Sequence, residues 1–460
     1  MNQPRKTYRL ATNSLGANDE VVSSSTPTDK AHAWALDATA AGVTKILKPP
    51  PDVDFSDWKS AGWGLILPYR NNLSNKELAS ASDAPKPIQL LCEMRNNAPI
   101  FRYRADTKEA VTHIRNYATR KSVPIENMNF GVKRDAIPFY LLIYGTPDEI
   151  PWRFQYQLNA THAVGRLDLT GRALQNYVRA LINDWQSESA DASKAIIWAA
   201  ETDAITKLMG SAIARKVYRK LQHDRDYRVQ FISRDKATQD NLISALKGWK
   251  PGLVITTSHG STSPWSNPRQ MSRNLGLMID QNKQTLDLKK LSKWEPNGAI
   301  WYAHACCSAG SDQTSVYDGL FDGQTPNGQL LNAVTKLGAK VAPLPRALLG
   351  APKPLRCFIG HVEPTFDWTI RPPEAGDDLT KPLVTALYNN LYSSKPVGLA
   401  FRDFYRRLLA LSALYDEMRA RYNQHQDTGA QMVYSRLAAW DIKSTVILGD
   451  PALSLSLPSK

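Results

Sequence analysis

The chain has 460 residues, of which 42% are hydrophobic and 22% charged, and it contains 25 glycines and 29 prolines. This composition is typical of a globular protein of two or three domains, and it excludes a collagen, a coiled coil and a wholly disordered chain. Lysine and arginine exceed aspartate and glutamate by 14, a net positive charge that would favour binding to nucleic acid or to an acidic partner. Basic and acidic residues are interspersed along the chain, however, which indicates a solvated surface.

In chain order, the first predicted segment is a loosely ordered extension over residues 1–84. Residues 1–50 are rich in Ser, Thr, Asn, Asp and Ala and show little periodicity. From residue 85 to 190, apolar runs alternate with helical periodicity, which predicts a small α/β subdomain. Strands are predicted at 88–92, at 137–144 and, as an extended segment, at 156–166, and helices at 108–121 and 170–185.

A polar stretch at 186–193 leads into a second α/β domain, predicted over residues 191–460. Its strands are predicted at 195–200, 228–232, 253–257, 299–304, 356–360 and 444–448, and its helices at 204–221, 238–246, 330–337, 379–391 and 397–421. Strands that alternate with helices of about 10–15 residues imply a mostly parallel sheet with helices on both faces. The predicted fold class is therefore α/β, with a smaller α/β subdomain before the larger domain.

Three features indicate the compartment. No apolar run approaches the roughly 18 residues of a membrane helix, and the longest covers only 137–144. The basic residues near the N-terminus are followed by no apolar stretch, so no secretory leader is expected. The four cysteines are too few for a disulfide framework in a chain of this length. A reducing compartment, most simply the cytosol, is therefore predicted.

Reactive side chains stand at the ends of two predicted strands. The strand at 253–257 is followed by His259 and Gly260, and the strand at 299–304 is followed by Cys306. Ligands of a parallel α/β sheet lie at the carboxyl ends of its strands, so both side chains are predicted to face one site. Their separation in the sequence is close to the roughly 50 residues between the His and the Ala-Cys pair of caspases.

This pairing predicts nucleophilic catalysis. A thiol is mostly protonated at neutral pH and needs an adjacent imidazole to become a thiolate, so Cys306 is the candidate nucleophile and His259 the candidate base. The backbone N–H groups of Gly260 and Cys306 are the candidate oxyanion donors. Each motif alone is also typical of a turn or of a packed cysteine. Cys307 is interpreted as a bystander beside the nucleophile.

Further segments accompany the pair in a fixed order. They are 139–145, 150–151 and 164–166, then Thr257-Ser-His259-Gly260 with Trp265, then His304-Ala305-Cys306, and finally Gly449-Asp450-Pro451-Ala452-Leu453. This ordered set resembles the clan CD cysteine peptidases, the caspase-like fold of caspases, legumains, CHAT-domain proteases and gingipains. It is most similar to the gingipain type, and the resemblance covers about residues 85–455.

The resemblance implies a Cys-His dyad in a caspase-like catalytic domain at 191–460, preceded by a non-catalytic subdomain at 85–190. In gingipains a Glu at the end of the first catalytic strand orients the His. Glu201 stands at the matching position and is the implied orienting acid. The alternative is that Glu201 is only a solvated acid at a helix N-terminus. Asp203 is the second candidate for the acid that orients His259.

Candidate substrate contacts come from three places. His304 stands before Ala-Cys, a position that lines the specificity pocket of caspases, and a core histidine is the alternative. Glu363, Asp367 and Trp368 follow the strand at 356–360, where acids would suit a basic substrate side chain, and solvated loop residues are the alternative. Asp203 is the acid nearest to the gingipain specificity loop, but this loop is shortened here, so a preference for Arg or Lys does not follow.

No phosphate-binding loop and no zinc-ligand spacing is found in the sequence, so neither a cofactor nor a metal is expected. The predicted function is that of a cysteine endopeptidase that hydrolyses protein or peptide substrates, as an intracellular regulatory or defence protease. The alternative is a caspase-like scaffold, silent or activated by a protein partner, that binds a protein or nucleic acid. A transpeptidase that uses the same thiolate is a third reading. Neither a membrane nor nucleic acid as a direct substrate is expected.

Overall fold

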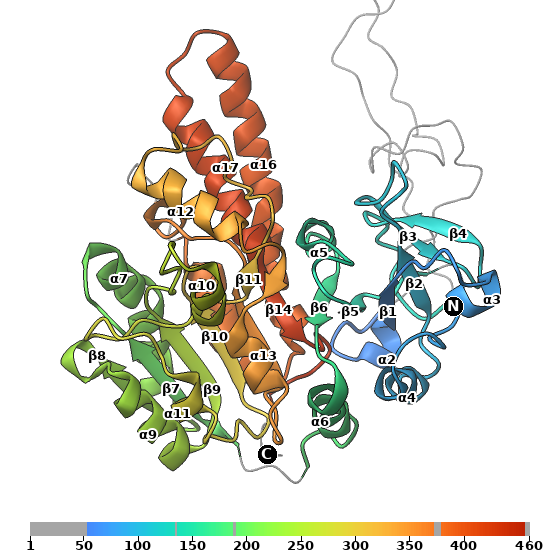
Figure 1. Cartoon of the computed structure of the whole chain (residues 1–460), viewed down its shortest axis with the longest axis horizontal. Helices are drawn as coiled ribbons and strands as arrows, with labels where there is room; N and C mark the ends of the chain where they lie inside the picture. The colour runs from blue at the N-terminus through green and yellow to red at the C-terminus, as the bar shows by residue number, and fades with distance from the viewer. Residues whose placement is uncertain (1–52, 134–135, 187–189, 372–378, 456–460) are drawn as a thin grey trace, which may run out of the picture. The chain divides into compact units, whose positions relative to one another are not determined.

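A 12-stranded β-sheet, in the order β4-β3-β2-β1-β5-β6-β14-β13-β10-β9-β7-β8, lies at the centre of the unit Asp54–Lys460 (Figure 1). The computed structural model describes residues 53–133, 136–186, 190–371 and 379–455. The class is α/β with a mostly parallel sheet, as the sequence predicts.

The sheet consists of two blocks of strands that run in opposite directions. The first block contains β1 (Trp63–Pro68), β2 (Ile100–Tyr103), β5 (Tyr140–Tyr144), β6 (Ala163–Leu167) and β14 (Thr445–Gly449), all parallel, with the hairpin β3 (His113–Asn116) and β4 (Lys121–Pro124) antiparallel at its edge. The second contains β7 (Asp191–Ala199), β8 (Arg228–Ser233), β9 (Pro251–Thr257), β10 (Ile300–His304) and β13 (Cys357–His361). The blocks meet where β13 pairs antiparallel with β14. The carboxyl ends of the two blocks therefore lie at opposite edges of the sheet.

Helices connect and cover these strands. They are α2 (Trp58–Ala61), α3 (Asn75–Leu78), α4 (Lys86–Met94), α5 (Trp152–Leu158), α6 (Gly171–Ile182), α7 (Ala204–Met209), α8 (Arg215–Gln222), α9 (Gln239–Trp249), α10 (Pro268–Asn274), α11 (Leu288–Leu291), α12 (Pro326–Thr335), α13 (Pro343–Leu349), α14 (Lys381–Thr385), α15 (Val397–Ala400), α16 (Arg402–Asn423) and α17 (Gly429–Ser444). A π-helical turn at Gly210–Ala214 joins α7 to α8, and a short ladder pairs β11 (Gly310–Ser311) with β12 (Lys340–Val341). Figure 1 shows α16 and α17 side by side as a helical hairpin.

The core lies where the two blocks meet. Every residue of β9, β10, β13 and β14 is buried, so both faces of the sheet are covered there. The indole of Trp301 is fully buried, and its Nε1–H donates to Thr256 Oγ1 on the neighbouring strand at 3.0 Å. Among the helices of the described residues, none combines the length and the hydrophobicity that a membrane span needs.

Several predicted elements of the first half are wrong. The segment 88–92 lies in helix α4, which has Pro87 in its first turn; a short apolar run cannot by its periodicity be told from a strand. The segment 108–121 holds turns and the start of the β3–β4 hairpin instead of a helix. Of the extended segment 156–166, only the second part is a strand, β6, since the first part belongs to α5.

The predicted extension over 1–84 also needs correction. Residues 1–52 lie outside the described part of the chain, but residues 63–68 form β1, which pairs with β2 on one side and β5 on the other. An ordered region therefore begins well before residue 84. In the second half, the predicted strands coincide with β7, β8, β9, β10, β13 and β14, whereas helix α17 falls in a segment for which the sequence predicted no element.

Candidate active site

The ends of β9 and β10 bring His259 and Cys306 to the same edge of the sheet. The two strands are parallel neighbours up to the pair Thr257–His304. Beyond this pair the chains stay together, because a Cβ added at Gly260 would lie only 1.9 Å from the carbonyl oxygen of Cys306. Only glycine allows the two backbones to approach this closely.

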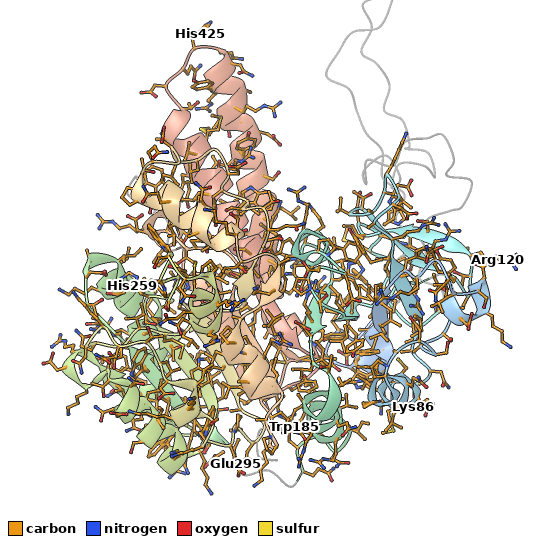
Figure 2. The ribbon with its side chains drawn as sticks, in the orientation of Figure 1. Lys86, Arg120, Trp185, His259, Glu295 and His425 are labelled. Carbon is orange, nitrogen blue, oxygen red and sulfur yellow. The ribbon has the colours of Figure 1, made fainter. Side chains whose placement is uncertain are left out.

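The ring of His259 is held by Asp203. Its Nε2 lies 2.5 Å from Asp203 Oδ2, and the His259 side chain is 38% exposed near helix α7 (Figure 2). Asp203 is also the N-cap of α7, where it accepts the N–H of Thr206 at 3.0 Å. Burial alone would raise the pKa of Asp203, but the hydrogen bonds from Thr206 and His259 outweigh it and lower the pKa to about 2.

This geometry assigns different tasks to the two ring nitrogens. An ionised carboxylate can only accept hydrogen bonds. Nε2 of His259 is therefore protonated and donates its N–H to Asp203. In the neutral ring the lone pair is then on Nδ1, for which the described residues provide no hydrogen-bond partner. The contact with Asp203 therefore fixes Nε2 and leaves Nδ1 open to another group.

Glu201 does not orient His259, so the implied role of this residue is corrected. Its side chain is 7% exposed and forms an ion pair with Arg215 of α8. The same carboxylate packs against Gly210, where an added Cβ would lie 2.6 Å from Oε1. The chain turns after β7 in such a way that Glu201 faces α8, while Asp203, the second candidate, faces the loop after β9.

Cys306 differs from the other cysteines in its exposure. It is partly exposed, whereas the other three of the four cysteines are buried. Its Sγ accepts the N–H of Thr365 at 3.3 Å and lies 3.8 Å from the carbonyl and hydroxyl oxygens of the same residue. In the described residues no hydrogen bond joins Sγ to His259. Burial raises the pKa of the Cys306 thiol, so the thiol is neutral at pH 7 and needs a base for reaction.

Cys307 is a packing residue. It is fully buried in an apolar cluster with Met271, Leu275, Val334 and Leu337. Burial raises the pKa of its thiol well above the ordinary value. Its backbone has a φ of +55°, so it is in the left-handed region directly after Cys306.

Two backbone donors flank the Cys306 thiol. Within the described residues the N–H of Gly260 has no hydrogen-bond acceptor, and the N–H of Cys306 lies close to its own Sγ. Their neighbours are used, because Ser261 donates to the Leu277 carbonyl at 2.8 Å and Cys307 to the Glu363 carbonyl at 3.2 Å. Most backbone N–H groups in folded proteins are paired, so the open N–H of Gly260 beside Cys306 is a donor that an oxyanion could use.

Two of the predicted substrate contacts are buried. His304 is 3% exposed, and its Nδ1 lies 2.9 Å from the Tyr302 hydroxyl and 3.2 Å from His361 Nε2. Burial lowers the pKa of His304 to about 4, so it is a neutral core histidine. Glu363 is 2% exposed and accepts hydrogen bonds from Ser315 and Val316, and burial raises its pKa to about 7. Neither side chain is at the surface.

The remaining candidates follow Thr365 in the chain, and Trp368 packs against a buried cluster that includes Tyr317 and Leu437. Asp367 is exposed and Trp368 half-buried, in a 3₁₀ turn that begins two residues after Thr365. Thr365 itself was not predicted, because a single threonine in a loop carries no pattern that links it to a distant thiol. The described residues hold no cluster of three His, Cys, Asp or Glu side chains that could bind a metal ion.

The parts of the site fit acyl transfer: a thiol, an imidazole bound to an ionised carboxylate, and the open N–H of Gly260. Asp450 of the Gly-Asp-Pro segment is not among these parts, since it is fully buried and bound by Trp63 Nε1 and Arg95. No protein-family model matches the sequence, and no curated protein matches it either.

Proposed function

We propose that the protein is a cysteine endopeptidase of the caspase-like, gingipain type, with Cys306 as nucleophile and His259 as general base and acid. The observation that carries the proposal is the placement of a partly exposed thiol and an Asp203-bound imidazole at the ends of adjacent parallel strands. The order of motifs along the chain supports the same family. Four free thiols suit work in a reducing cytosol.

In the proposed reaction, Nδ1 of His259 takes the thiol proton as Sγ of Cys306 attacks the carbonyl carbon of the scissile peptide. The resulting oxyanion accepts hydrogen bonds from the N–H groups of Gly260 and Cys306. His259 then gives its proton to the leaving amine, and a thioester remains. Water then gives a proton to His259 and attacks the thioester. The C–S bond breaks, the acid is released, and His259 returns the proton to the thiolate. Asp203 stays ionised throughout and stabilises the imidazolium.

The test compares Cys306→Ala with its neighbour. Cys306→Ala is expected to abolish cleavage of a positional-scanning peptide library and labelling by a thiol-reactive peptide probe. Cys307→Ala is the matched control and is expected to keep both, at a cost of stability because Cys307 packs in the core. Cleavage that survives in Cys306→Ala and disappears in Cys307→Ala would reassign the nucleophile, and cleavage that survives in both would end the proposal.

One observation favours a second candidate, a caspase-like scaffold that a partner activates. Sγ of Cys306 is held by the Thr365 N–H and not by His259. A partner that moves the Thr365 loop would release the thiol for the imidazole. This candidate predicts no probe labelling of the isolated chain and labelling after the partner is added. Salt-dependent retention on DNA or RNA without labelling in any condition would favour a silent scaffold instead. Product masses would separate hydrolysis from transpeptidation.

A further inference from the structure

A cavity of about 420 Å³ lies at the carboxyl ends of β1, β5 and β6. β1 pairs with β2 on one side and with β5 on the other, so the direction of chain progression reverses between β1 and β5. In open α/β sheets, crevices at such reversals are where ligands bind, and the volume is within the range of small-molecule sites. Because the two blocks run in opposite directions, the cavity lies at the edge of the sheet opposite to Cys306.

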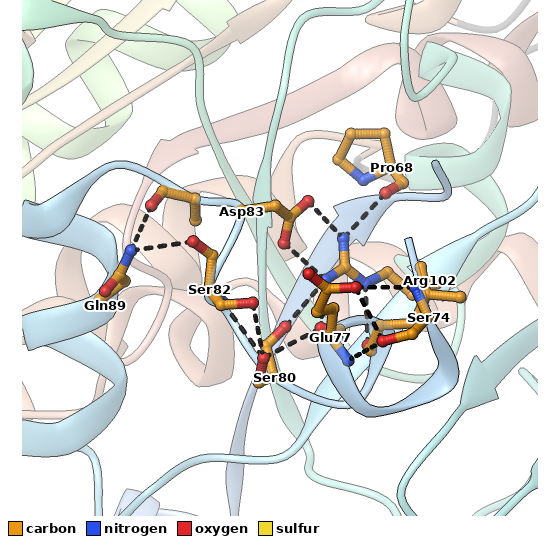
Figure 3. A network of polar contacts seen from close by, with 10 residues as sticks. Pro68, Ser74, Glu77, Ser80, Ser82, Asp83, Gln89 and Arg102 are labelled. Atoms are coloured by element: carbon orange, nitrogen blue, oxygen red, sulfur yellow. Dashed lines mark hydrogen bonds and ion pairs between the residues drawn. The ribbon is translucent and has the colours of Figure 1, made fainter. Parts of the chain in front are cut away.

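One wall of the cavity is fixed by a buried arginine. The guanidinium of Arg102 donates to the carbonyl oxygens of Pro68 and Ser80 at 3.1 and 2.8 Å and to both oxygens of Asp83 at 2.7 and 2.8 Å (Figure 3). Its side chain is 0% exposed. These bonds hold the segment before α4 against the end of β1, so the cavity is formed without a ligand.

Of the three carboxylates that line the cavity, two are satisfied. Asp83 is bound by Arg102 through both oxygens. Glu149 forms an ion pair with Arg70 and accepts the N–H of Thr146 at 3.1 Å. Neither requires a further partner.

The third carboxylate, Asp168, is different. It follows β6, and its side chain is only 7% exposed. The described residues offer it no hydrogen-bond donor, and it has only a long ion pair, at 4.0 Å, with Nε of the half-exposed Arg346. The nearby Arg166 is engaged elsewhere, because it donates to Gln155 and to the carbonyl oxygens of Gly145 and Ile150. The hydrogen-bond donors of Asp168 must therefore come from solvent or from a ligand in the cavity.

The rest of the lining determines the shape of such a ligand. Leucines 67, 73, 167 and 169 provide apolar walls that suit an alkyl chain. We propose that this cavity binds a small cationic ligand, an alkyl chain that ends in a guanidinium group whose N–H donors meet Asp168. The site is independent of the proposed peptidase activity.

The test uses isothermal titration calorimetry of the full chain with L-arginine and L-citrulline. The two differ in that a neutral urea replaces the guanidinium. Arginine is expected to bind with one site per chain, and citrulline at least 10-fold more weakly. This comparison needs no variant, so it does not depend on whether a substitution folds. Equal affinities, or no binding of arginine, would overturn the proposal.

Variants locate the binding. Asp168→Asn keeps the shape of the side chain and is expected to lose at least 10-fold in arginine affinity. Asp240→Asn removes an acid that is 73% exposed and lies outside the cavity, and it is expected to bind as wild type does. Cys306→Ala is also expected to bind as wild type does, because the thiol lies at the other edge. Unchanged binding in Asp168→Asn, or loss of binding in Cys306→Ala, would refute this site.

Discussion

Asp203→Asn separates the two roles of Asp203 in the structure. Asparagine caps a helix about as well as aspartate, so the capping of α7 is expected to persist with little change in stability. The hydrogen bond from His259 loses its charge, however. A hydrogen bond to a charged group is worth about 1.5–3 kcal/mol, and the half-exposed position of Asp203 reduces this to about 1–2 kcal/mol. At 1.4 kcal/mol per factor of ten, the expected loss is about 5- to 30-fold in kcat/KM.

The assay needs no known substrate. The rate at which iodoacetamide alkylates Cys306, followed by mass spectrometry at several pH values, reports how readily His259 takes the thiol proton. Asp203→Asn is expected to slow this rate at neutral pH by the same factor. Glu201→Gln is the matched control, because Glu201 pairs with Arg215 and should affect stability without affecting alkylation. Equal slowing in both variants, or slowing in Glu201→Gln alone, would refute the assignment of Asp203.

Three further predictions follow from other contacts. Gly260→Ala is expected to reduce both thermal stability and probe labelling, because its Cβ would overlap the Cys306 carbonyl; a variant with wild-type melting and labelling would contradict the close approach. Asp450→Ala leaves Arg95 buried and unpaired, so urea unfolding is expected to show a loss of about 3–5 kcal/mol, and a loss below about 1 kcal/mol would be inconsistent with the ion pair. Burial raises the pKa of Glu363 from 4.5 to about 7, so its stabilising effect is complete below pH 4.5 and disappears as the pH rises through 7. Glu363→Gln is therefore expected to raise the melting temperature at pH 8 more than at pH 5, and an equal change at both would count against this titration.

The sequence predicted the second half of the sheet better than the first, for a physical reason. Strands such as 253–257 and 299–304 are buried on both faces, so they are continuous apolar runs between turn residues. In the first half, β3 and β4 are short and partly exposed. β1 is a buried apolar run that was assigned, with the polar residues before it, to the N-terminal extension. Their pairing depends on tertiary contacts that no local pattern contains.

The candidate site was likewise predictable only in part. Strand ends in a parallel sheet share an edge, so the meeting of His259 and Cys306 could be expected from their positions alone. The acid that binds His259 could not be predicted. Glu201 and Asp203 are only two residues apart, and the path of the chain after β7 determines which of them faces His259. The contact of Thr365 with Cys306 joins segments 59 residues apart and left no signal in the sequence.

The position of β14 has a consequence for synthesis of the protein. This strand, Thr445–Gly449, lies between β6 and β13 and is the only link in the sheet between the two blocks of the described residues. While the chain emerges from the ribosome, each half-sheet would present an open edge, at β6 and at β13, until residues 445–449 have been made. Unpaired edges invite pairing with other chains, so nascent or truncated forms that lack this strand should depend on chaperones or aggregate.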